Sequence, residues 1–266
     1  MTTIHDLRQG LHVSYSQVRT FMICPTRLEH SHVLGTEPSH RPVALAFGGA
    51  VHAALAAFYG HVMTQGEAIP LDALQAAFRD RWEAELDEPI PILFDDVKDA
   101  GAVVDQGVAM LRVFHERAEI PHVVAIEQPF SVDLVDPATG EVLDLRLVGA
   151  FDLVTNGAGK PVIWEHRTAA RKYTKDQLAY DLQPSVYAYA AREIGMADVG
   201  LKYQILLKTR TPGIEICNVK RTAPDVREML MTVTTVLSAI ERGIFYRNRG
   251  WACADCQFAY RCGASL

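Results

Sequence analysis

Residues 145–168 read LRLVGAFDLVTNGAGKPVIWEHRT, two largely apolar runs separated by the turn-forming sequence Asn-Gly-Ala-Gly at 156–159. This pattern predicts a β-hairpin. If the chain folds back at the middle of the turn, Asp152 lies directly opposite Glu165, with the two Cβ atoms about 5 Å apart. Because side chains alternate along a strand, Arg167 lies on the same face as Glu165. The hairpin therefore predicts two carboxylates and one cation in a single small patch.

The predicted patch has apolar neighbours, namely Phe151, Leu153, Ile163 and Trp164. Two carboxylates this close in apolar surroundings repel each other unless a cation is present. A divalent metal ion would remove the repulsion and could orient a water molecule against a phosphodiester. The alternative interpretation is an ordinary surface hairpin whose polar side chains face water.

The rest of the chain alternates between helical and strand patterns. Ser14 to Gln17 have the form of a capping box, which predicts a short helix that ends near Cys24-Pro25. Further helices are predicted at 43–60, 71–87, 97–118, 175–194 and 223–242, and strands at 123–132, 143–155, 161–166, 199–207 and 214–219. This order predicts an α/β fold, a mixed central sheet flanked by helices, with 71–87 and 97–118 as an inserted helical arm.

The composition fits one domain with a well-buried core, because 49% of the 266 residues are hydrophobic and 22% are charged. No run of apolar residues approaches the roughly 20 needed to cross a bilayer, so no membrane partner is expected. The start, MTTIHDLRQG, lacks the apolar segment of a secretion signal, and five cysteines without regular spacing do not suggest a secreted disulfide framework. A reducing cytoplasm is the expected compartment. The net charge of −6 does not by itself indicate nucleic-acid binding.

Three motifs together resemble the PD-(D/E)XK nucleases of the RecB type. Gly149-Ala150-Phe151-Asp152 followed by Glu165-His166-Arg167-Thr168 is similar to the family pattern G-x-x-D…(D/E)-x-K-T. The segment Gly48 to His52 resembles its G-x-x-x-H motif, and Gln183 to Tyr187 its Q-x-x-x-Y motif. The resemblance implies a restriction-endonuclease-like core in which Asp152, Glu165 and His52 bind Mg²⁺ or Mn²⁺. Gln183 and Tyr187 share one helix face and would help to hold the substrate. Considered apart from the hairpin, these residues have ordinary structural interpretations. His52 would be a core residue, and Gln183 and Tyr187 would form the packing face of a helix.

Arg167 departs from the family pattern, which has a water-positioning lysine at this position. The guanidinium group of arginine is bulky, planar and effectively never deprotonated, whereas the ammonium group of lysine is a compact point charge. Arginine could still stabilise negative charge on a phosphate. The sequence leaves three interpretations open: a tolerated variant, a weakened or inactive nuclease, or a substitution made to trap a substrate. We expect Arg167 to lower turnover while metal and DNA binding survive.

Cysteines gather at the C-terminus as Cys253, Cys256 and Cys262, and a four-coordinate site needs one more thiolate. Cys24 and Cys217 are the candidates, and Cys217 lies in an apolar strand typical of an inert core thiol. One N-terminal cysteine with three C-terminal ones resembles the iron–sulfur staple of the AddB-like and CRISPR-adaptation nucleases. The resemblance implies a [4Fe–4S] cluster on Cys24, Cys253, Cys256 and Cys262, while the spacing leaves zinc open. Such a site would fix the two ends of the chain against each other.

The expected organisation is therefore a single nuclease domain over 1–266. It has a helical insertion at 61–120, a catalytic sheet core at 121–221 and a cluster site at 24 and 253–262. The resemblance implies a metal-dependent deoxyribonuclease, an exonuclease on single-stranded DNA or DNA ends. Arg171, Lys172 and Lys175 directly follow the motif and are expected to contact phosphates. The alternatives are a catalytically inactive nucleic-acid-binding or assembly subunit with the same fold, and a hydrolase of small phosphoesters.

Overall fold

The computed structural model describes residues 3–94, 99–157, 159–196 and 198–263. Its centre is a six-stranded sheet in the order β1-β5-β6-β7-β8, with β4 also paired to β5. The strands are β1 His12–Val13, β4 His122–Val135, β5 Val142–Gly157, β6 Lys160–Ala169, β7 Gly200–Leu207 and β8 Gly213–Val219. The β1–β5 and β6–β7 pairs are parallel and the other pairs are antiparallel. The sheet is therefore mixed, as the sequence predicts.

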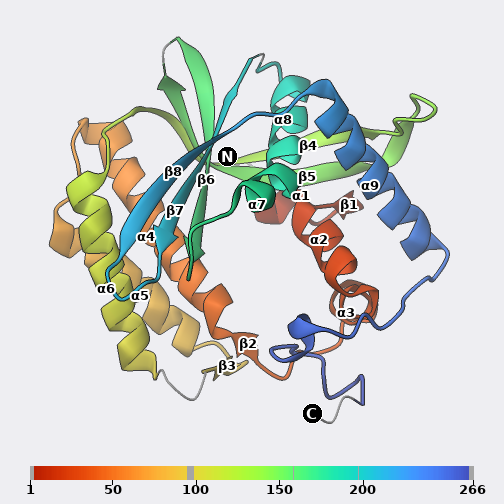
Figure 1. The fold of residues 1–266 in the computed structure, drawn as a ribbon, viewed down its shortest axis with the longest axis horizontal. Coiled ribbons are helices and arrows are strands. Elements are labelled where there is room, and N and C mark those ends of the chain that lie inside the picture. The colour runs from red at the N-terminus through yellow and green to blue at the C-terminus, as the bar shows by residue number, and fades with distance from the viewer. Residues whose placement is uncertain (1–2, 95–98, 158, 197, 264–266) are drawn as a thin grey trace.

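Helices cover both faces of the sheet (Figure 1). On one side lie α4, α5 and α6, and on the other α2, α8 and α9. The helices are α1 Ile4–Leu7, α2 Tyr15–Ile23, α3 Pro25–Leu28, α4 Val43–Gln65, α5 Leu71–Leu86, α6 Ala100–Arg117, α7 Lys175–Tyr180, α8 Gln183–Glu193 and α9 Ala223–Glu241. A π-helical turn at Glu29–Val33, a 3₁₀ turn at Trp251–Cys253 and a small sheet of β2 Arg41–Pro42 with β3 Ile92–Leu93 complete the described chain.

The two helical layers exist because adjacent residues of the central strands point to opposite faces. Leu153 and Trp164 pack with α4, α5 and α6, whereas their neighbours Val154 and Ile163 pack with α8 and α9. All four side chains are buried. Strands that are apolar on both faces need cover on both, and this produces the three layers.

α4 corrects one expectation from the sequence. Its 23 residues make it long and apolar enough, by length and composition alone, to cross a membrane, although no such stretch was expected. In the fold its small and aromatic residues, among them Ala50, Ala54 and Phe58, are fully buried in the core against α5, α6 and the sheet. The apolar character of α4 is therefore accounted for by its position as a core helix.

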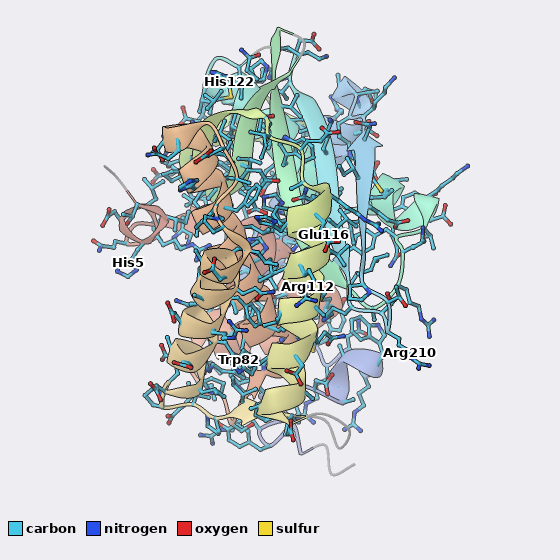
Figure 2. The ribbon with its side chains drawn as sticks, turned by 90° about the vertical axis from the view of Figure 1, so that its left-hand side faces the viewer. His5, Trp82, Arg112, Glu116, His122 and Arg210 are labelled. Carbon is cyan, nitrogen blue, oxygen red and sulfur yellow. The ribbon has the colours of Figure 1, made fainter. Side chains whose placement is uncertain are left out.

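Three helices differ from the predicted boundaries by more than one residue. The helix predicted at 43–60 is α4, which continues to Gln65. The helix predicted at 97–118 is α6, which begins at Ala100; residues 97 and 98 lie outside the described part of the chain. The helix predicted at 175–194 is two helices, because Asp181 adopts an extended conformation after α7 and Pro184 lies in the first turn of α8. Figure 2 views the molecule from the side of α5 and α6, where Arg112 and Glu116 lie on the outward surface of α6 and are exposed.

The hairpin has the predicted register. Gly157 pairs with Lys160 and Leu153 with Trp164, so the next position places Asp152 opposite Glu165. Ala158, in the predicted turn, lies outside the described residues. The paired stretch ends at Leu153 and Trp164, whereas β6 remains paired with β7 as far as Ala169. β5 and β6 therefore separate at the two carboxylates.

Candidate active site

The point where β5 and β6 separate is bridged by a side chain. The backbone N–H of His166 donates a hydrogen bond of 2.8 Å to Oδ2 of Asp152. A carboxylate thus satisfies an amide that strand pairing no longer serves, as a buried backbone donor requires. The same bond fixes the Asp152 side chain at the mouth of the fork between the strands.

Three potential metal ligands meet at this fork: His52 of α4, Glu127 of β4 and Asp152 of β5. Their ligand atoms all lie within 4.8 Å of one another. Nδ1 of His52 is 3.8 Å from Oδ2 of Asp152 and 3.9 Å from Oε1 of Glu127. We call these three residues the fork triad. Two carboxylates and an imidazole form a donor set that suits Mn²⁺ or Mg²⁺.

Glu127 was not among the residues that the sequence suggested. The pairs Ile126–Leu153 and Gln128–Phe151 flank it, so Glu127 lies opposite Asp152. Its φ of 46° is in the left-handed region, which is uncommon for a residue other than glycine. Strained backbone of this kind gathers at functional sites. A sequence signal existed only as an isolated acidic residue in an apolar strand.

The imidazole of His52 is oriented by the hairpin itself. Its Nε2 lies 3.1 Å from the backbone carbonyl oxygen of His166, which can only accept a hydrogen bond. Nε2 therefore carries a proton, and in the neutral ring the lone pair is on Nδ1, which faces the two carboxylates. Metal-binding histidines are commonly oriented by such a bond from the second nitrogen.

Charges crowd the fork. Burial lowers the pKa of His52, but Glu127, Asp152 and Glu165 outweigh it and raise the pKa to about 9. Burial and the nearby Glu165 raise the pKa of Asp152 well above its ordinary value, against the opposing effects of His52 and the His166 amide. Without an added cation, the site therefore holds protons that its residues would not hold in water.

Glu165 lies beside the fork triad and has its own donors. Its Oε2 accepts hydrogen bonds from Nε2 of Gln183 at 2.8 Å and from the hydroxyl of Tyr187 at 2.6 Å. The second hydrogen of Gln183 Nε2 goes to the Tyr187 oxygen at 2.9 Å. Burial still raises the pKa of Glu165, and Arg167 and Tyr187 oppose that rise. The structure thus brings Gln183 and Tyr187 onto the carboxylate, from one face of α8.

Arg167 forms an ion pair with Glu165, with Nη2 3.0 Å from Oε1. The same nitrogen donates to Oε1 of Gln183. Burial lowers the pKa of Arg167, but Glu165, Tyr203 and Tyr15 outweigh it and raise the pKa above the ordinary arginine value. The guanidinium is therefore a permanent charge that neutralises Glu165.

Asp181 is a second residue that the sequence did not suggest. Its carboxylate accepts from the hydroxyls of Tyr15 and Tyr203, both at 2.6 Å, and from the backbone N–H of Gln183 at 3.0 Å. Burial raises the pKa of Asp181, but these three donors outweigh it and lower the pKa. Asp181 thereby joins α2 and β7 to the start of α8, and it fixes the backbone of the residue whose side chain bridges Glu165 and Arg167.

His166 faces the opposite side of the sheet from Glu165. It is buried and stacks on Tyr59, with ring centroids 5.5 Å apart and an interplanar angle of 3°. Burial and the charge of His52 lower the pKa of His166 to about 3, so the ring is neutral. Its side chain therefore adds no charge to the site, and its backbone atoms are the part that orients Asp152 and His52.

The basic residues after the motif lie on the surface, from the segment that follows β6 to the first residue of α7. Arg171, Lys172 and Lys175 are exposed. Lys172 forms an ion pair of 2.5 Å with Glu215 of β8. Among the residues that the structure describes, no hydrogen bond or ion pair joins this segment to the fork triad.

The four cysteines singled out by the sequence line one cavity. Cys24, Cys253, Cys256 and Cys262 are free thiols there, together with Arg27 and Arg247. Burial raises the pKa of Cys262, and Arg247 opposes the rise. Cys217 lies apart, in β8. The fold therefore gathers residues more than 200 positions apart in the sequence.

These features define a fork of potential metal ligands on a mixed sheet, and comparison with known families assigns the chain to one family. The model of the PD-(D/E)XK nuclease superfamily matches residues 12–263, so the chain belongs to that superfamily. The match includes the hairpin, the fork triad and all four cysteines of the cavity.

Solved structures agree on the fold. The crystal structure of a "Putative exonuclease" from Eubacterium rectale matches with a TM-score of 0.56 at 17% identity, covering 96% of this chain and 89% of that one. The structure of SSO0001 covers 97% of this chain and 99% of its own at 14% identity, but its TM-score of 0.38 supports no conclusion. No curated protein sequence matches the chain.

The raised pKa of His52 predicts how stability depends on pH and Mg²⁺. Its folded pKa of about 9 lies above the ordinary 6.5, so in metal-free protein the protonated ring stabilises the fold below pH 6.5. That contribution is lost as the pH rises through 9. An ion binds the deprotonated ring, so the Mg²⁺-induced rise in Tm should grow across this window. We expect Mg²⁺ at a hundredfold excess over its Kd to raise the Tm by about 5 °C.

Thermal melts of the His52→Ala variant, with and without Mg²⁺, check this prediction. The variant should lose most of the shift and its pH dependence, whereas His61→Ala on the same helix should behave as the wild type. Equal shifts in His52→Ala and wild type at every pH would contradict the assignment of His52.

Proposed function

We propose that this chain is a metal-dependent DNA nuclease, an exonuclease acting on single-stranded DNA or DNA ends. The observation that carries the proposal is the fork triad of His52, Glu127 and Asp152, gathered where two strands separate. Membership of the PD-(D/E)XK superfamily supports phosphodiester hydrolysis. The fold shared with a "Putative exonuclease" agrees with the exonuclease mode.

The fork triad fits a divalent ion by its chemistry. It offers carboxylate oxygens and the Nδ1 lone pair of an imidazole whose Nε2 already donates to a carbonyl. When bound, Mg²⁺ or Mn²⁺ would supply Lewis-acid stabilisation of the phosphate and lower the pKa of nearby water. Glu165, placed beside the triad and held by Gln183 and Tyr187, is the proposed additional carboxylate of the site.

The surrounding residues position the groups that react. Tyr187 and Gln183 hold Glu165 in one orientation, and Asp181 fixes the start of their helix. Arg167 replaces the family lysine and neutralises Glu165. We propose that Arg171, Lys172 and Lys175 contact substrate phosphates, which would place the strand without reading its sequence.

The competing proposal is a nucleic-acid-binding subunit that retains the fold but does not cut. It is favoured by one observation, namely that Arg167 is bonded to Glu165 and Gln183 where a mobile lysine is expected. A hydrolase of small phosphoesters is less well supported, because the exposed basic segment after β6 suits a longer polyanion.

The proposed activity predicts Mn²⁺-dependent cleavage of end-labelled single-stranded DNA. Asp152→Asn and Glu127→Gln each remove one charged ligand and should lower the rate by about a hundredfold or more. Asp144→Asn, an exposed carboxylate on the same strand as Asp152, should retain the wild-type rate. If the wild type binds the single-stranded DNA but does not cleave it, the proposal of a non-cleaving subunit would be favoured.

The arginine of the motif makes a separate prediction. Arg167→Lys should raise the cleavage rate, because lysine restores a compact ammonium that is free to approach the attacking water. Metal binding and strand binding should change little. Single-turnover rates for the two proteins test this, and equal rates would remove Arg167 as a cause of weak turnover.

We further propose that the cysteine cavity holds a [4Fe–4S] cluster, as in the AddB-like nucleases. The fold brings the four thiols of the proposed ligand set, Cys24, Cys253, Cys256 and Cys262, to one cavity. Four thiolates could also bind one zinc, so the choice of an iron–sulfur cluster rests on the resemblance.

Hydrogen bonds already join the two ends of the chain around this cavity. The Ser39 N–H donates to the Gln257 carbonyl at 3.0 Å, and the Tyr260 hydroxyl donates to the Glu37 carbonyl at 2.7 Å. Nδ2 of Asn248 donates to the Ile23 carbonyl at 2.8 Å. A cluster at this position would close a loop of nearly the whole chain, and it would need the reducing cytoplasm that we propose as its location.

Protein purified without oxygen should therefore be brown and absorb at about 400 nm. Cys24→Ser should abolish this absorbance and lower the Tm, whereas Cys217→Ser, in β8, should leave both unchanged. Iron and zinc analysis identifies the metal. A colourless protein fully occupied by zinc would contradict the cluster.

A further inference from the structure

A second hollow lies between the start of α4 and the ends of β6 and β7. It has a volume of about 330 Å³. We call it the Phe94 pocket; six of the residues that line it are Val43, Phe47, Leu93, Phe94, Lys208 and Asp255. This size is in the range of small-molecule sites, and such sites combine apolar walls with a few polar groups.

The lining suits a flat, polar-edged aromatic ring. Phe94 provides a partly exposed aromatic wall. Phe47 also lines the pocket, but it is only 3% exposed, and Nζ of Lys208 lies 5.3 Å from its ring centroid. Asp255 brings an exposed carboxylate to the rim. Nucleobases stack on aromatic side chains, and a carboxylate can accept a hydrogen bond from the amino group of cytosine.

The pocket lies along the same elements as the catalytic residues. Phe47 precedes His52 by five residues on α4, which is about 7.5 Å along the helix axis. Ala170, which also lines the pocket, follows Arg167 by three residues, about 10 Å along an extended chain. When the phosphate of one nucleotide lies at the fork triad, the neighbouring nucleotide can span offsets of this length along α4 and β6.

We propose that the Phe94 pocket binds one unpaired nucleobase of the substrate strand, next to the phosphodiester that is cut. The proposal rests on the nuclease function and adds a reason for single-strand preference. A base within a duplex has its faces stacked and its hydrogen-bonding edge paired, so it cannot enter. Asp255 favours a base with an exocyclic amino group, such as cytosine, over thymine.

The cysteine segment supplies one residue of the lining of this pocket, Asp255. Asp255 lies between Cys253 and Cys256, both of which line the neighbouring cysteine cavity. Occupation of the cysteine cavity therefore fixes the backbone that carries Asp255. The pocket connects the cysteine site to substrate binding through one polar side chain.

Binding measurements on the full chain test the pocket, with Ca²⁺ in place of Mn²⁺ to prevent cutting. Fluorescence anisotropy is recorded for single strands that carry one abasic position, moved along the strand. In the wild type, one position should weaken binding about tenfold, the effect of one lost stacking contact. In Phe94→Ala the same abasic strand should bind no more weakly than the intact strand.

Base preference gives a second measurement that does not depend on a half-buried side chain. Wild type should bind oligo-dC more tightly than oligo-dT. Asp255→Asn, an exposed and isosteric change, should lose at least half of that preference, whereas Asp144→Asn should keep it. Thermal melts show that each variant is folded.

The two proposals fail separately. Suppose that the abasic position weakens strand binding in the wild type but not in Phe94→Ala, while no DNA is cut with Mn²⁺. This result would support the pocket and overturn the proposed nuclease activity. Cleavage with an abasic effect unchanged in Phe94→Ala and a preference unchanged in Asp255→Asn would overturn the pocket alone. A chain that binds no single strand would overturn both.

Discussion

The separation of β5 from β6 is the constraint on which the site depends. Had the two strands stayed paired beyond Leu153 and Trp164, the His166 amide would have a backbone partner and the Asp152 carboxylate would be free to turn away. Because they separate, Asp152 takes over the amide, and the His166 carbonyl orients His52. One short stretch of backbone therefore aligns ligands from α4 and β5, and the antiparallel register of β4 brings Glu127 to the same point.

The carboxylates of the site are not equivalent, and the difference follows from their hydrogen-bond donors. Glu165 is surrounded by donors, Gln183, Tyr187 and Arg167, and its charge is matched within the protein. Among the residues that the structure describes, Glu127 and Asp152 pair with His52 alone as a group of opposite charge, and only when that ring is protonated. The side chain of Asp152 is mostly buried, whereas that of Glu127 is exposed. A buried charge without a fixed partner costs free energy that protonation or a bound cation removes. The fork triad is thus the part of the site where an ion would remove this cost, mainly at Asp152.

The sequence predicted what depends on local pattern and failed where distant register decides. The hairpin followed from two apolar runs and a turn, and the register placed Asp152 opposite Glu165 as predicted. Glu127 was missed because its position depends on the β4–β5 pairing, which contains two irregularities that no single-sequence pattern shows. Asp181 was missed because its partners Tyr15 and Tyr203 are 166 and 22 residues away. The apolar length of α4 was underestimated, because the helix was expected to end at residue 60 and continues to Gln65.

Charge balance explains how an acidic chain can attract a polyanion. The protein carries a formal net charge of −6, and the fork concentrates carboxylates where a phosphate must come. In the metal-free protein the raised pKa values of His52 and Asp152 favour the protonated form of both groups. A divalent ion would displace these protons, and with Glu165 neutralised by Arg167 its charge would equal the two negative charges of Glu127 and Asp152. The ion-bound site would then be neutral with an electron-poor centre. Ion binding at the fork should therefore precede productive substrate binding, and replacing lysine by arginine at 167 leaves this balance of charge unchanged.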